Sequence, residues 1–424
     1  MRVAIVGLGQ IGLPLAVQYA SRGHQVVGCD IDERIVAAVN AGIPPHPGER
    51  EVDELVPELV ASGRLRATTD GTDGVRDAEG VVIIVPVLVD EARRIDFRAI
   101  DAATRDISHG IGAGVLVVFE TTVPVGTTRD RLTPILEQGS GLSAERDLFV
   151  AFSPERVLVG RVLLDLRRYP KVVGGIGPES TARARAFYEQ ALDPGTEIRV
   201  LSSAEAAEMT KLAETTYRDV NIALANEYAR YAAERGIDVM EVIDAANSQP
   251  YSHVHLPGVG VGGHCIPVYP HFLFADAPDL QLPRAARQIN DGMAAWTVSA
   301  MEHQIGSLRE QPVLVLGIAY RGGVREDAFS SAFALRDALQ AAGAQVHGYD
   351  PLFSADELAA HGFAPWTPND PAPVRALILQ ADHPQFRDLD FARLPGLELV
   401  VDGRNVLDPA VIRAAGKGYL GVGR

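Results

Sequence analysis

The sequence predicts an α/β protein in which two Rossmann-like parallel-sheet domains are joined by a long central helix within a helical domain. Short apolar runs alternate with helical patterns toward both ends of the chain, which is typical of βαβ units and a parallel sheet. Between these regions, residues 202–235 contain no glycine or proline, which favours one long helix. At 424 residues the chain is also too long for a single core. We therefore expect domains at 1–200, 201–305 and 311–424.

The N-terminal domain is expected to hold a parallel sheet of buried strands. The apolar runs are bounded by Gly, Pro, Asp or Ser and read RVAIVG, HQVVGCD, GVVIIVP, GVLVVFE, LFVAFS and KVVGG. Between the first two, GLPLAVQYASRG has a helical period and a glycine stop. A smaller sheet of the same kind is expected from four later segments: PVLVLGIAYRGG, FALRDALQAAGAQVHGYDP, VRALILQAD and LELVVDGRN.

The long helix is expected to be a spine between the domains and a subunit interface. Its apolar residues fall broadly on one helical face; they are Met209, Leu212, Ala213, Val220, Ala223, Leu224 and Tyr228. Pairing through this face would make the protein a homodimer.

Composition narrows the functional class. A net charge of −16 argues against nucleic acid and anionic membrane surfaces as partners, although a small anionic ligand needs only local positive groups. The longest apolar run is about half of a membrane span. Two cysteines give no disulfide or zinc framework, so we expect no metal and a reducing cytoplasm. Of the two, Cys29 is expected to be a packing residue.

A glycine motif, GLGQIG, follows the first predicted strand and opens the first helix. Gly7, Gly9 and Gly12 are expected to give a tight turn, close approach to a pyrophosphate and a helix N-terminus directed at that anion. Asp30 lies at the end of the next strand, where its carboxylate would accept hydrogen bonds from ribose hydroxyls and favour NAD over NADP. The alternative is a tight turn that binds no nucleotide.

The second cysteine, Cys265, lies in GVGVGGHCIPVYP, residues 258–270. Glycine and proline rule out regular structure there, whereas a packing cysteine is expected inside a helix or strand. One interpretation is a nucleophile that attacks a carbonyl, forming a thiohemiacetal that a second hydride transfer converts to a thioester. The other is a small apolar filler beside a turn. The NAD motif in the same chain favours the nucleophile.

Three further stretches fit such chemistry. In ETTVPVGTT, Thr121 or Thr122 is placed to hold a water, or else to cap a helix. In FSPER, Glu155 is either an acid or base or an ordinary surface carboxylate. Lys211 and Thr215 share one helical face, where Lys211 would stabilise an oxyanion or simply face solvent.

Together these residues resemble the UDP-glucose/GDP-mannose dehydrogenase family of nucleotide-sugar 6-dehydrogenases. The motifs that carry the resemblance occur in order along nearly the whole chain: GLGQIG, TTVPVG, SPERVLVG, KLAETTYRDVNIALANE, GVGGHCIP, GIAYRGG and YDP. The SPER form, RDVNIALANE and GGHCIP are more similar to the branch acting on UDP-N-acetylhexosamines (UDP-ManNAc or UDP-GlcNAc) than to the UDP-glucose branch.

The resemblance implies an NAD-dependent, four-electron oxidation of a sugar C6 alcohol to a carboxylate, on a UDP-sugar substrate, for polysaccharide synthesis. Cys265 matches the family nucleophile, Lys211 the oxyanion-stabilising lysine, Glu155 the glutamate linked to thioester hydrolysis, and Thr122 the threonine that orients water. The expected cofactor contacts are Gly7, Gly9, Gln10, Ile11, Gly12, Asp30, Pro86 and Thr122. The expected substrate contacts are Arg156, Lys211, Gly260 and Arg321, the last in a C-terminal domain that binds the nucleotide end.

Several positions depart from the family pattern. Thr215 replaces an asparagine that assists the lysine, and Tyr269 replaces an aspartate near the catalytic base. A phenol is a poor base at neutral pH, so Tyr269 is a weak substitute for the aspartate. The candidates for compensating proton transfer are His264, beside the cysteine, and Tyr269 itself. VPVL at 85–88 lacks a hydroxyl of the usual VPTP. In the C-terminal domain Arg321 replaces a lysine, and Ala328 an arginine.

Two other functions remain open from the sequence. A β-hydroxyacid dehydrogenase also combines a Rossmann domain with a lysine-bearing helix, although Cys265 and a third domain argue against it. A catalytically altered family member would bind NAD or a sugar nucleotide without turnover, consistent with the changes at positions 215 and 269. UDP-glucose is the alternative substrate.

Overall fold

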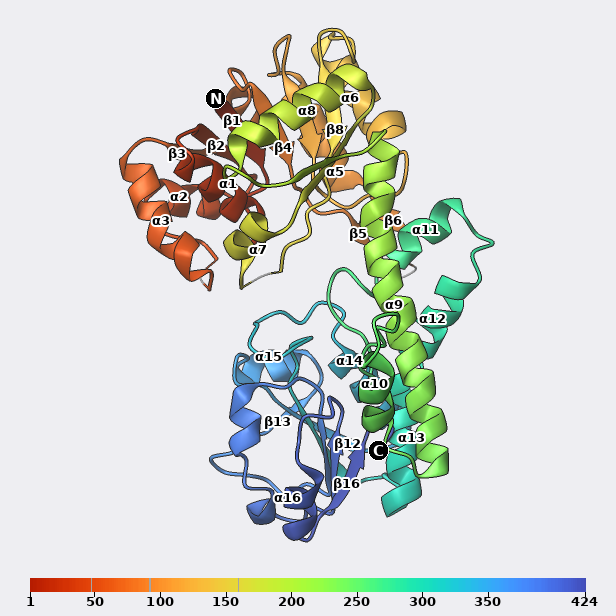
Figure 1. The fold of residues 1–424 in the computed structure, drawn as a ribbon. Coiled ribbons are helices and arrows are strands. Elements are labelled where there is room, and N and C mark those ends of the chain that lie inside the picture. Colours follow the sequence, from red (N-terminus) through yellow and green to blue (C-terminus); the bar gives the residue numbers. More distant parts are fainter. Residues whose placement is uncertain (47, 91–92, 159) are drawn as a thin grey trace. The chain divides into compact units, whose positions relative to one another are not determined.

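The computed structural model describes residues 1–424 except 47, 91–92 and 159. Its contacts divide the chain into two compact units. Unit 1 comprises residues 1–214 and 271–278, and unit 2 comprises residues 215–270 and 279–424. Helix α9 (Ala204–Arg235) contributes to both (Figure 1). The α/β class, with two mostly parallel sheets and a long helix, is confirmed.

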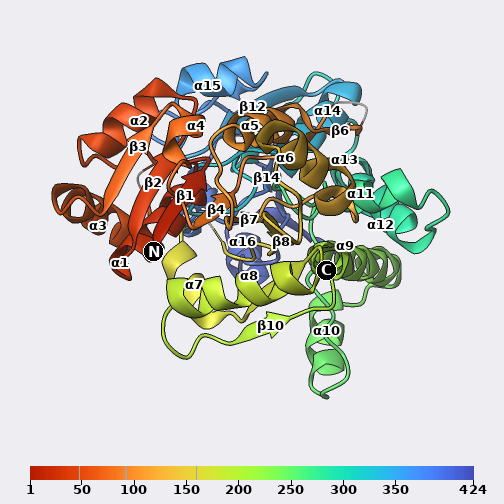
Figure 2. The ribbon, with the colours of Figure 1, turned by 90° about the horizontal axis from the view of Figure 1, so that it is seen from above.

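Unit 1 is built on an eight-stranded sheet in the order β10-β9-β8-β7-β4-β1-β2-β3. Part of this order, from β3 through β2, β1 and β4, can be followed in Figure 2. The strands are β1 (Arg2–Val6), β2 (Gln25–Cys29), β3 (Leu65–Thr68), β4 (Gly80–Ile83), β7 (Leu116–Phe119), β8 (Phe149–Phe152), β9 (Lys171–Gly175) and β10 (Ile198–Val200). A small separate hairpin pairs β5 (Leu88–Val89) with β6 (Ile95–Asp96).

The expectation of a purely parallel sheet is wrong at one place, because β8 and β9 pair antiparallel. A strand with two buried faces reads as a continuous apolar run in either direction, so KVVGG carried no signal of its orientation. Strands β3 and β10 were also missed, because LRAT and IRV are short and carry an arginine each.

The helices of unit 1 connect and flank its strands. They are α1 (Gly12–Ser21), α2 (Glu33–Asn40), α3 (Arg50–Ala61), α4 (Gly71–Gly74), α5 (Arg98–Ser108), a π-helical turn η1 (Thr128–Leu132), α6 (Thr133–Ser140), α7 (Val162–Arg168) and α8 (Pro178–Ala191). The short α11 (Pro270–Asp276) lies mostly in this unit. Asp32 caps α2 by accepting a hydrogen bond from the Arg34 amide, and α1 has nine buried residues against the sheet.

Unit 2 contains a six-stranded, all-parallel sheet in the order β13-β12-β11-β14-β15-β16. The strands are β11 (Pro312–Leu316), β12 (Gln345–Tyr349), β13 (Ala364–Pro365), β14 (Ala376–Leu379), β15 (Leu399–Asp402) and β16 (Gly418–Gly421). The helices are α10 (Val239–Asn247), α12 (Leu282–Asp291), α13 (Met293–Ile305), α14 (Ser331–Ala341), α15 (Ala355–Ala360) and α16 (Pro409–Ala414), with 3₁₀ turns η2 (Pro384–Asp388) and η3 (Phe391–Arg393).

The long helix spans 32 residues, as its sequence predicts, and the apolar residues expected on one face are partly buried and partly exposed. Apart from Leu212, the buried positions are small or polar and include Ala207, Glu208, Lys211, Thr215, Asp219, Ala225 and Asn226. Several large side chains are exposed instead, at Met209, Tyr217, Leu224, Tyr228 and Tyr231. No helix in the described part of the chain is both long and apolar enough to cross a membrane.

Candidate functional site

The glycine motif forms the turn that the sequence predicts, between β1 and α1. Gly7 has φ +97° and its amide donates to the Cys29 carbonyl at 2.8 Å. An added Cβ at Gly12 would lie 1.8 Å from the Gly7 carbonyl oxygen, so only glycine fits there. Gly9 and Gln10 are exposed, and Ile11 precedes the helix without a side-chain cap. The helix N-terminus is therefore open to an anion such as a pyrophosphate.

Asp30 follows β2 and directs its carboxylate back toward this turn. One oxygen accepts a hydrogen bond from the Leu8 amide at 2.8 Å and the other from the Asp32 amide at 2.9 Å. These contacts fix the carboxylate at the carboxyl end of the parallel strands, where a dinucleotide's ribose binds in this fold. Turn, helix start and carboxylate together fit NAD.

Two strand-end loops meet beside this position. The Thr121 hydroxyl donates to the Val85 carbonyl at 2.7 Å, so this threonine ties its loop to the one carrying Pro86, which is exposed. Thr122 is buried next to it. Thr121 thus joins two loops, which differs from both the water contact and the helix cap considered from the sequence.

The loop after Thr122 is held by a carboxylate from α9. Glu208 is fully buried and accepts hydrogen bonds from the Gly126 amide at 2.6 Å, the Thr128 amide at 2.8 Å and the Thr128 hydroxyl at 2.6 Å. Burial raises the pKa of Glu208 to about 7, against the lowering effect of these donors. Because Lys211 follows three residues later, Glu208 fixes the register between the lysine's helix and the threonine loop.

Glu155 lies in a cluster of charged side chains gathered from three strand ends. The Lys171 ammonium, at the start of β9, is 3.0 Å from a carboxylate oxygen of Glu155 and 3.0 Å from one of Glu120, which follows β7. The Tyr188 hydroxyl donates to the other Glu120 oxygen at 2.5 Å. Burial raises the pKa of Glu120 to about 7. Burial would also raise the pKa of Glu155, but Lys171 and a hydrogen bond from Glu120 leave it lowered.

Lys211 and Arg156 are both engaged within unit 1. The Lys211 ammonium donates to the backbone carbonyl of Glu155, and the lysine is buried. The Arg156 guanidinium donates to Glu214 at 2.9 Å and to the Pro170 carbonyl. The interpretation of Lys211 as an exposed helix lysine is therefore wrong, and its charge lies beside Glu155.

In unit 2, Thr215 is fully buried on α9, one helical turn before a buried polar network. Asp219 accepts hydrogen bonds from Arg287 at 2.9 Å and Asn290 at 2.8 Å. Asn290 accepts from Asn226 at 2.8 Å, and Asn226 in turn accepts from the Gly258 amide at 2.9 Å. The network therefore anchors the first residue of the cysteine loop to α9 and α12.

The cysteine loop is irregular, as its glycines and prolines predict, and Cys265 is a free, half-buried thiol. A Cβ added at Gly260 would lie 2.7 Å from the Ser331 Cβ, and one at Gly262 only 2.9 Å from the Tyr320 Cβ. The Gly263 amide donates to the Ala328 carbonyl at 3.0 Å. Close backbone approach thus fastens the loop to the segment before α14.

Both residues suggested for compensating proton transfer lie on this loop. Tyr269 donates its amide to the Cys265 carbonyl at 2.9 Å, so one tight turn links the two. The His264 imidazole lies 3.4 Å from a Glu326 carboxylate and is 51% exposed. The hydrogen bond from His264 lowers the pKa of Glu326. His264 is thus directed toward the segment that follows Arg321.

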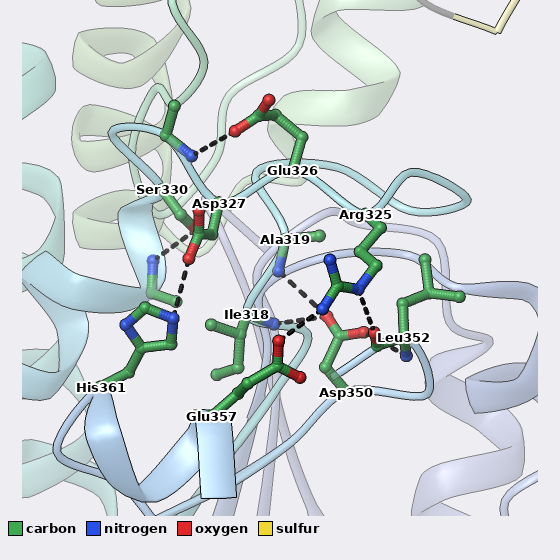
Figure 3. A network of polar contacts seen from close by, with 12 residues as sticks. Ile318, Ala319, Arg325, Glu326, Asp327, Ser330, Asp350, Leu352, Glu357 and His361 are labelled. Carbon is green, nitrogen blue, oxygen red and sulfur yellow. Dashed lines mark hydrogen bonds and ion pairs between the residues drawn. The ribbon is translucent and has the colours of Figure 1, made fainter. Parts of the chain in front are cut away.

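Arg321 belongs to the long connection between β11 and α14. Its Nε donates to the Tyr320 hydroxyl at 3.0 Å. Figure 3 shows how the following residues are held: Arg325 pairs with Glu357 and donates to the Leu352 carbonyl, and Asp327 lies 2.9 Å from the His361 ring. This segment is therefore a fixed surface on which the cysteine loop packs.

Asp350, in the YDP motif, occupies the place in unit 2 that Asp30 has in unit 1. It accepts from the Ile318 and Ala319 amides at 2.7 and 3.0 Å (Figure 3), and His383 lies 3.1 Å away. Burial would raise the pKa of Asp350, but His383 and these amides leave it lowered. Asp350 thus accepts from amides of the turn after β11, as Asp30 accepts from the Leu8 amide of the turn after β1.

Sequence reasoning missed Glu120, Lys171 and Glu208, all of which touch predicted site residues or their loops. Glu120 stands directly before the TTVPVG motif, and Lys171 opens the apolar run KVVGG. A charged residue at the boundary of a buried strand is the one signal that could have drawn attention to the first two.

A parallel sheet with a dinucleotide-binding turn and an aspartate at the end of the second strand defines the class of NAD-dependent dehydrogenases. Comparison with known proteins agrees. Models of the UDP-glucose/GDP-mannose dehydrogenase family match at residues 1–192 (NAD binding domain), 205–292 (central domain) and 314–409 (UDP binding domain). The chain belongs to this family and is an NAD-dependent oxidoreductase.

Individual relatives cover the chain almost completely. It is 33% identical to UDP-N-acetyl-D-mannosamine dehydrogenase of Pyrococcus horikoshii, covering 100% of this chain and 99% of the relative. It is 34% identical to NDP-N-acetyl-D-galactosaminuronic acid dehydrogenase of Ralstonia solanacearum, covering 95% and 96%. The solved structure of UDP-D-ManNAc dehydrogenase from Pyrococcus horikoshii matches with a TM-score of 0.89 at 32% identity, covering 100% and 99%. The alternative of a β-hydroxyacid dehydrogenase is therefore set aside.

Proposed function

We propose that this protein oxidises the C6 hydroxymethyl group of a UDP-N-acetylhexosamine, with UDP-ManNAc favoured, to a carboxylate. UDP-glucose is the second candidate substrate. The first preference is supported by the names of the relatives that cover nearly the whole chain. The sugar loses four electrons in two steps, so two NAD molecules are reduced and one water is consumed per sugar.

The observation that carries the proposal is the Cys265 thiol on its rigid glycine loop in an NAD-dependent enzyme. NAD, held at Gly7, Gly9, Gln10, Ile11, Gly12, Asp30, Pro86 and Thr122, would accept the hydride in both oxidations. After the first oxidation, the Cys265 thiolate adds to the aldehyde carbon and forms a thiohemiacetal. Loss of a second hydride leaves a thioester, and water then breaks the C–S bond and releases the carboxylate.

The buried residues of unit 1 would control charge and water in these steps. Lys211 carries the positive charge that stabilises the oxyanion on C6, with Thr215 in the place of the usual asparagine. Thr122 orients the attacking water, and Glu155 accepts its proton. His264 and Tyr269 are assigned to proton transfer near the thiol, in place of the missing aspartate.

The substrate contacts are assigned by charge and by backbone access. Arg321 would bind a phosphate of the UDP group, and Arg156 would contact the sugar nucleotide after leaving Glu214. Gly260 allows the ligand to approach the main chain. The proposed division into domains at 1–200, 201–305 and 311–424 follows the same assignment of cofactor, nucleophile and nucleotide binding.

A homodimer through α9 is part of the proposal. Met209, Tyr217, Leu224, Tyr228 and Tyr231 place large apolar side chains at exposed positions of one helix, and a self-complementary surface of this kind favours a two-fold pair. Two free cysteines are consistent with a cytoplasmic enzyme. The uronic acid product would serve polysaccharide synthesis.

The test is the amount of NADH formed per sugar when UDP-ManNAc, UDP-GlcNAc and UDP-glucose are offered separately with NAD. The proposal predicts two NADH per sugar and a uronate product with one of the acetylated sugars. No NADH from any of them, while NAD still binds, would refute the substrate assignment and favour a catalytically altered family member.

A further inference from the structure

The described part of unit 1 contains a buried charge cluster larger than the proposed chemistry requires. Glu155 is the group assigned to thioester hydrolysis. Three more ionisable side chains, Lys171, Glu120 and Tyr188, continue the cluster from it. Lys171 lies 3.0 Å from both Glu155 and Glu120, and Glu120 contacts Tyr188 at 2.5 Å. The Lys171 ammonium also lies 5.0 Å from the centre of the Tyr188 ring.

The side-chain charges that contact one another in this cluster balance when one carboxyl group is protonated, because the nearby Lys211 ammonium reaches only the backbone carbonyl of Glu155 among the contacts described. Two carboxylates face one ammonium, and Glu120 and Lys171 have side chains at most 7% exposed. Removing an uncompensated negative charge from water costs several kcal/mol. The Glu120 oxygen nearest to Lys171 is buried and lies 3.0 Å from that ammonium, and a hydrogen bond between Glu120 and Glu155 affects the pKa of both carboxyl groups.

The cluster borders a small pocket through Glu155 and Lys171, of which Glu155 is the more exposed. The Glu155 side chain keeps 11% of its surface exposed, whereas Glu120 has none. This pocket is lined by Pro154, Glu155, Arg156 and Lys171 together with residues of the segment 165–170. The buried Glu120 carboxyl group, the Lys171 ammonium and the Glu155 carboxylate therefore lie in a row that ends at this pocket, where water can enter.

We propose that Glu120 and Lys171 are positioning residues that hold Glu155 as a carboxylate facing the pocket. This inference rests on the proposed function, because it gives Glu155 its task in thioester hydrolysis. Lys171 supplies the positive charge beside the Glu155 oxygen, and protonated Glu120 donates to it. Tyr188 fixes the Glu120 orientation from the opposite side.

In the step concerned, the water oxygen bonds to the thioester carbon and one water proton moves to Glu155. The C–S bond then breaks, the Cys265 sulfur leaves as a thiolate, and the carboxylate product is released. No electrons are exchanged in this step. Glu155 afterwards returns its proton to solvent through the pocket, while Lys171 keeps its charge throughout.

The pH dependence follows from the groups around Glu120. It is faced by Glu155, by Lys171 of β9, by Tyr188 of α8 and by Tyr19 of α1; Lys211 of α9 reaches the Glu155 backbone. Both tyrosines have a raised pKa from burial and stay neutral. Above its pKa of about 7, Glu120 adds a second negative charge. This charge strengthens Glu155 as a base, so hydrolysis accelerates from pH 6 to pH 8.

The experiment measures hydrolysis apart from hydride transfer in the full-length protein. With Lys171→Met, rapid mixing with NAD and substrate should still give two NADH per active site, followed by turnover at least about tenfold slower than wild type. Intact-protein mass spectrometry should show acylated Cys265 accumulating. Lys171→Arg should recover part of the rate, and Arg131→Met, which removes an ion pair with Asp101 elsewhere in unit 1, should leave it unchanged.

Glu120→Gln provides the second arm of the experiment. Glutamine keeps the shape of glutamate, and its amide donates a hydrogen bond in place of the protonated carboxyl group. The ratio of wild-type to variant hydrolysis rates should rise from pH 6 to pH 8, and this arm decides alone if Lys171→Met does not fold. A pH-independent ratio would overturn the inference, as would burst and turnover that fall in parallel without acyl-enzyme. Failure of the proposed function would be distinct, since wild type itself would then yield no uronate.

Discussion

The buried pair of Arg287 and Asp219 gives a prediction whose size can be worked from the structure. Both side chains are at most 5% exposed, and they lie 2.9 Å apart. Removing one partner of a buried ion pair costs about 3–5 kcal/mol of unfolding free energy. Arg287→Met should therefore destabilise unit 2 strongly, but only where Asp219 is charged.

The sign of the pH dependence follows from the raised pKa of Asp219. Burial raises it to about 6, against the opposing effect of Arg287, whereas the unfolded value is about 3.9. The folded state thus binds the extra proton, and wild-type stability falls as pH rises from about 4 to about 6. Without Arg287 the folded pKa rises further, so the fall continues above pH 6 at about 1.4 kcal/mol per pH unit.

The expected cost of Arg287→Met is about 1 kcal/mol at pH 5, where a hydrogen bond to Asp219 and a largely exposed pair with Asp291 are lost, and about 4 kcal/mol at pH 8. Urea unfolding followed by circular dichroism at both pH values measures it. Arg287→Met combined with Asp219→Asn should abolish the difference. Arg325→Met, which breaks a largely exposed pair with Glu357, should cost less than about 1 kcal/mol at either pH. An equal cost of Arg287→Met at pH 5 and pH 8 would refute the reasoning.

Three other predictions concern single positions. Gly12→Ala places a methyl group 1.8 Å from a backbone carbonyl oxygen and should weaken NAD binding at least about tenfold by calorimetry; Gly112→Ala, where nothing lies within 4 Å, should not. Iodoacetamide should alkylate Cys265 and spare Cys29, because burial raises the pKa of Cys29 to about 12; equal labelling by mass spectrometry would contradict this. Tyr228→Arg should convert a dimer to monomers in light scattering, and an unchanged mass would exclude this face of α9 as the interface.

The local features of the fold could be predicted from the sequence. GLGQIG and Asp30 form a turn and a strand end within one βαβ unit, so their spacing alone determines their geometry. The irregular conformation of the cysteine loop could be predicted in the same way, because glycine and proline disfavour regular structure whatever surrounds them. Thr215 was placed on a long helix for the same reason, since no residue from 202 to 235 interrupts its period.

The surroundings of Glu155 could not be predicted in this way. Glu120, Glu155 and Lys171 follow or open three different strands, and they meet only because β8 and β9 pair antiparallel. No periodicity in the sequence encodes that orientation. The packing of α9 could not be predicted either: apart from Leu212, small and polar residues fill its buried side, while Met209, Leu224 and Tyr228 are exposed.

The changes at Thr215 and Tyr269 acquire a physical context from the structure. Thr215 is fully buried on α9, so its hydroxyl is not in contact with bulk solvent. Tyr269 is tied to Cys265 by a backbone hydrogen bond of 2.9 Å. If Cys265 is the nucleophile that we propose, Tyr269 lies within one turn of it, so the role of Cys265 is the first point to test.

The most direct measurement is uronate formation by Cys265→Ala beside wild type, with each UDP-sugar and NAD. The account predicts that wild type yields uronate with two NADH per sugar, and that the variant forms none while still binding NAD with wild-type affinity. A variant that releases uronate at a rate near that of wild type would contradict the covalent mechanism and assign Cys265 to packing.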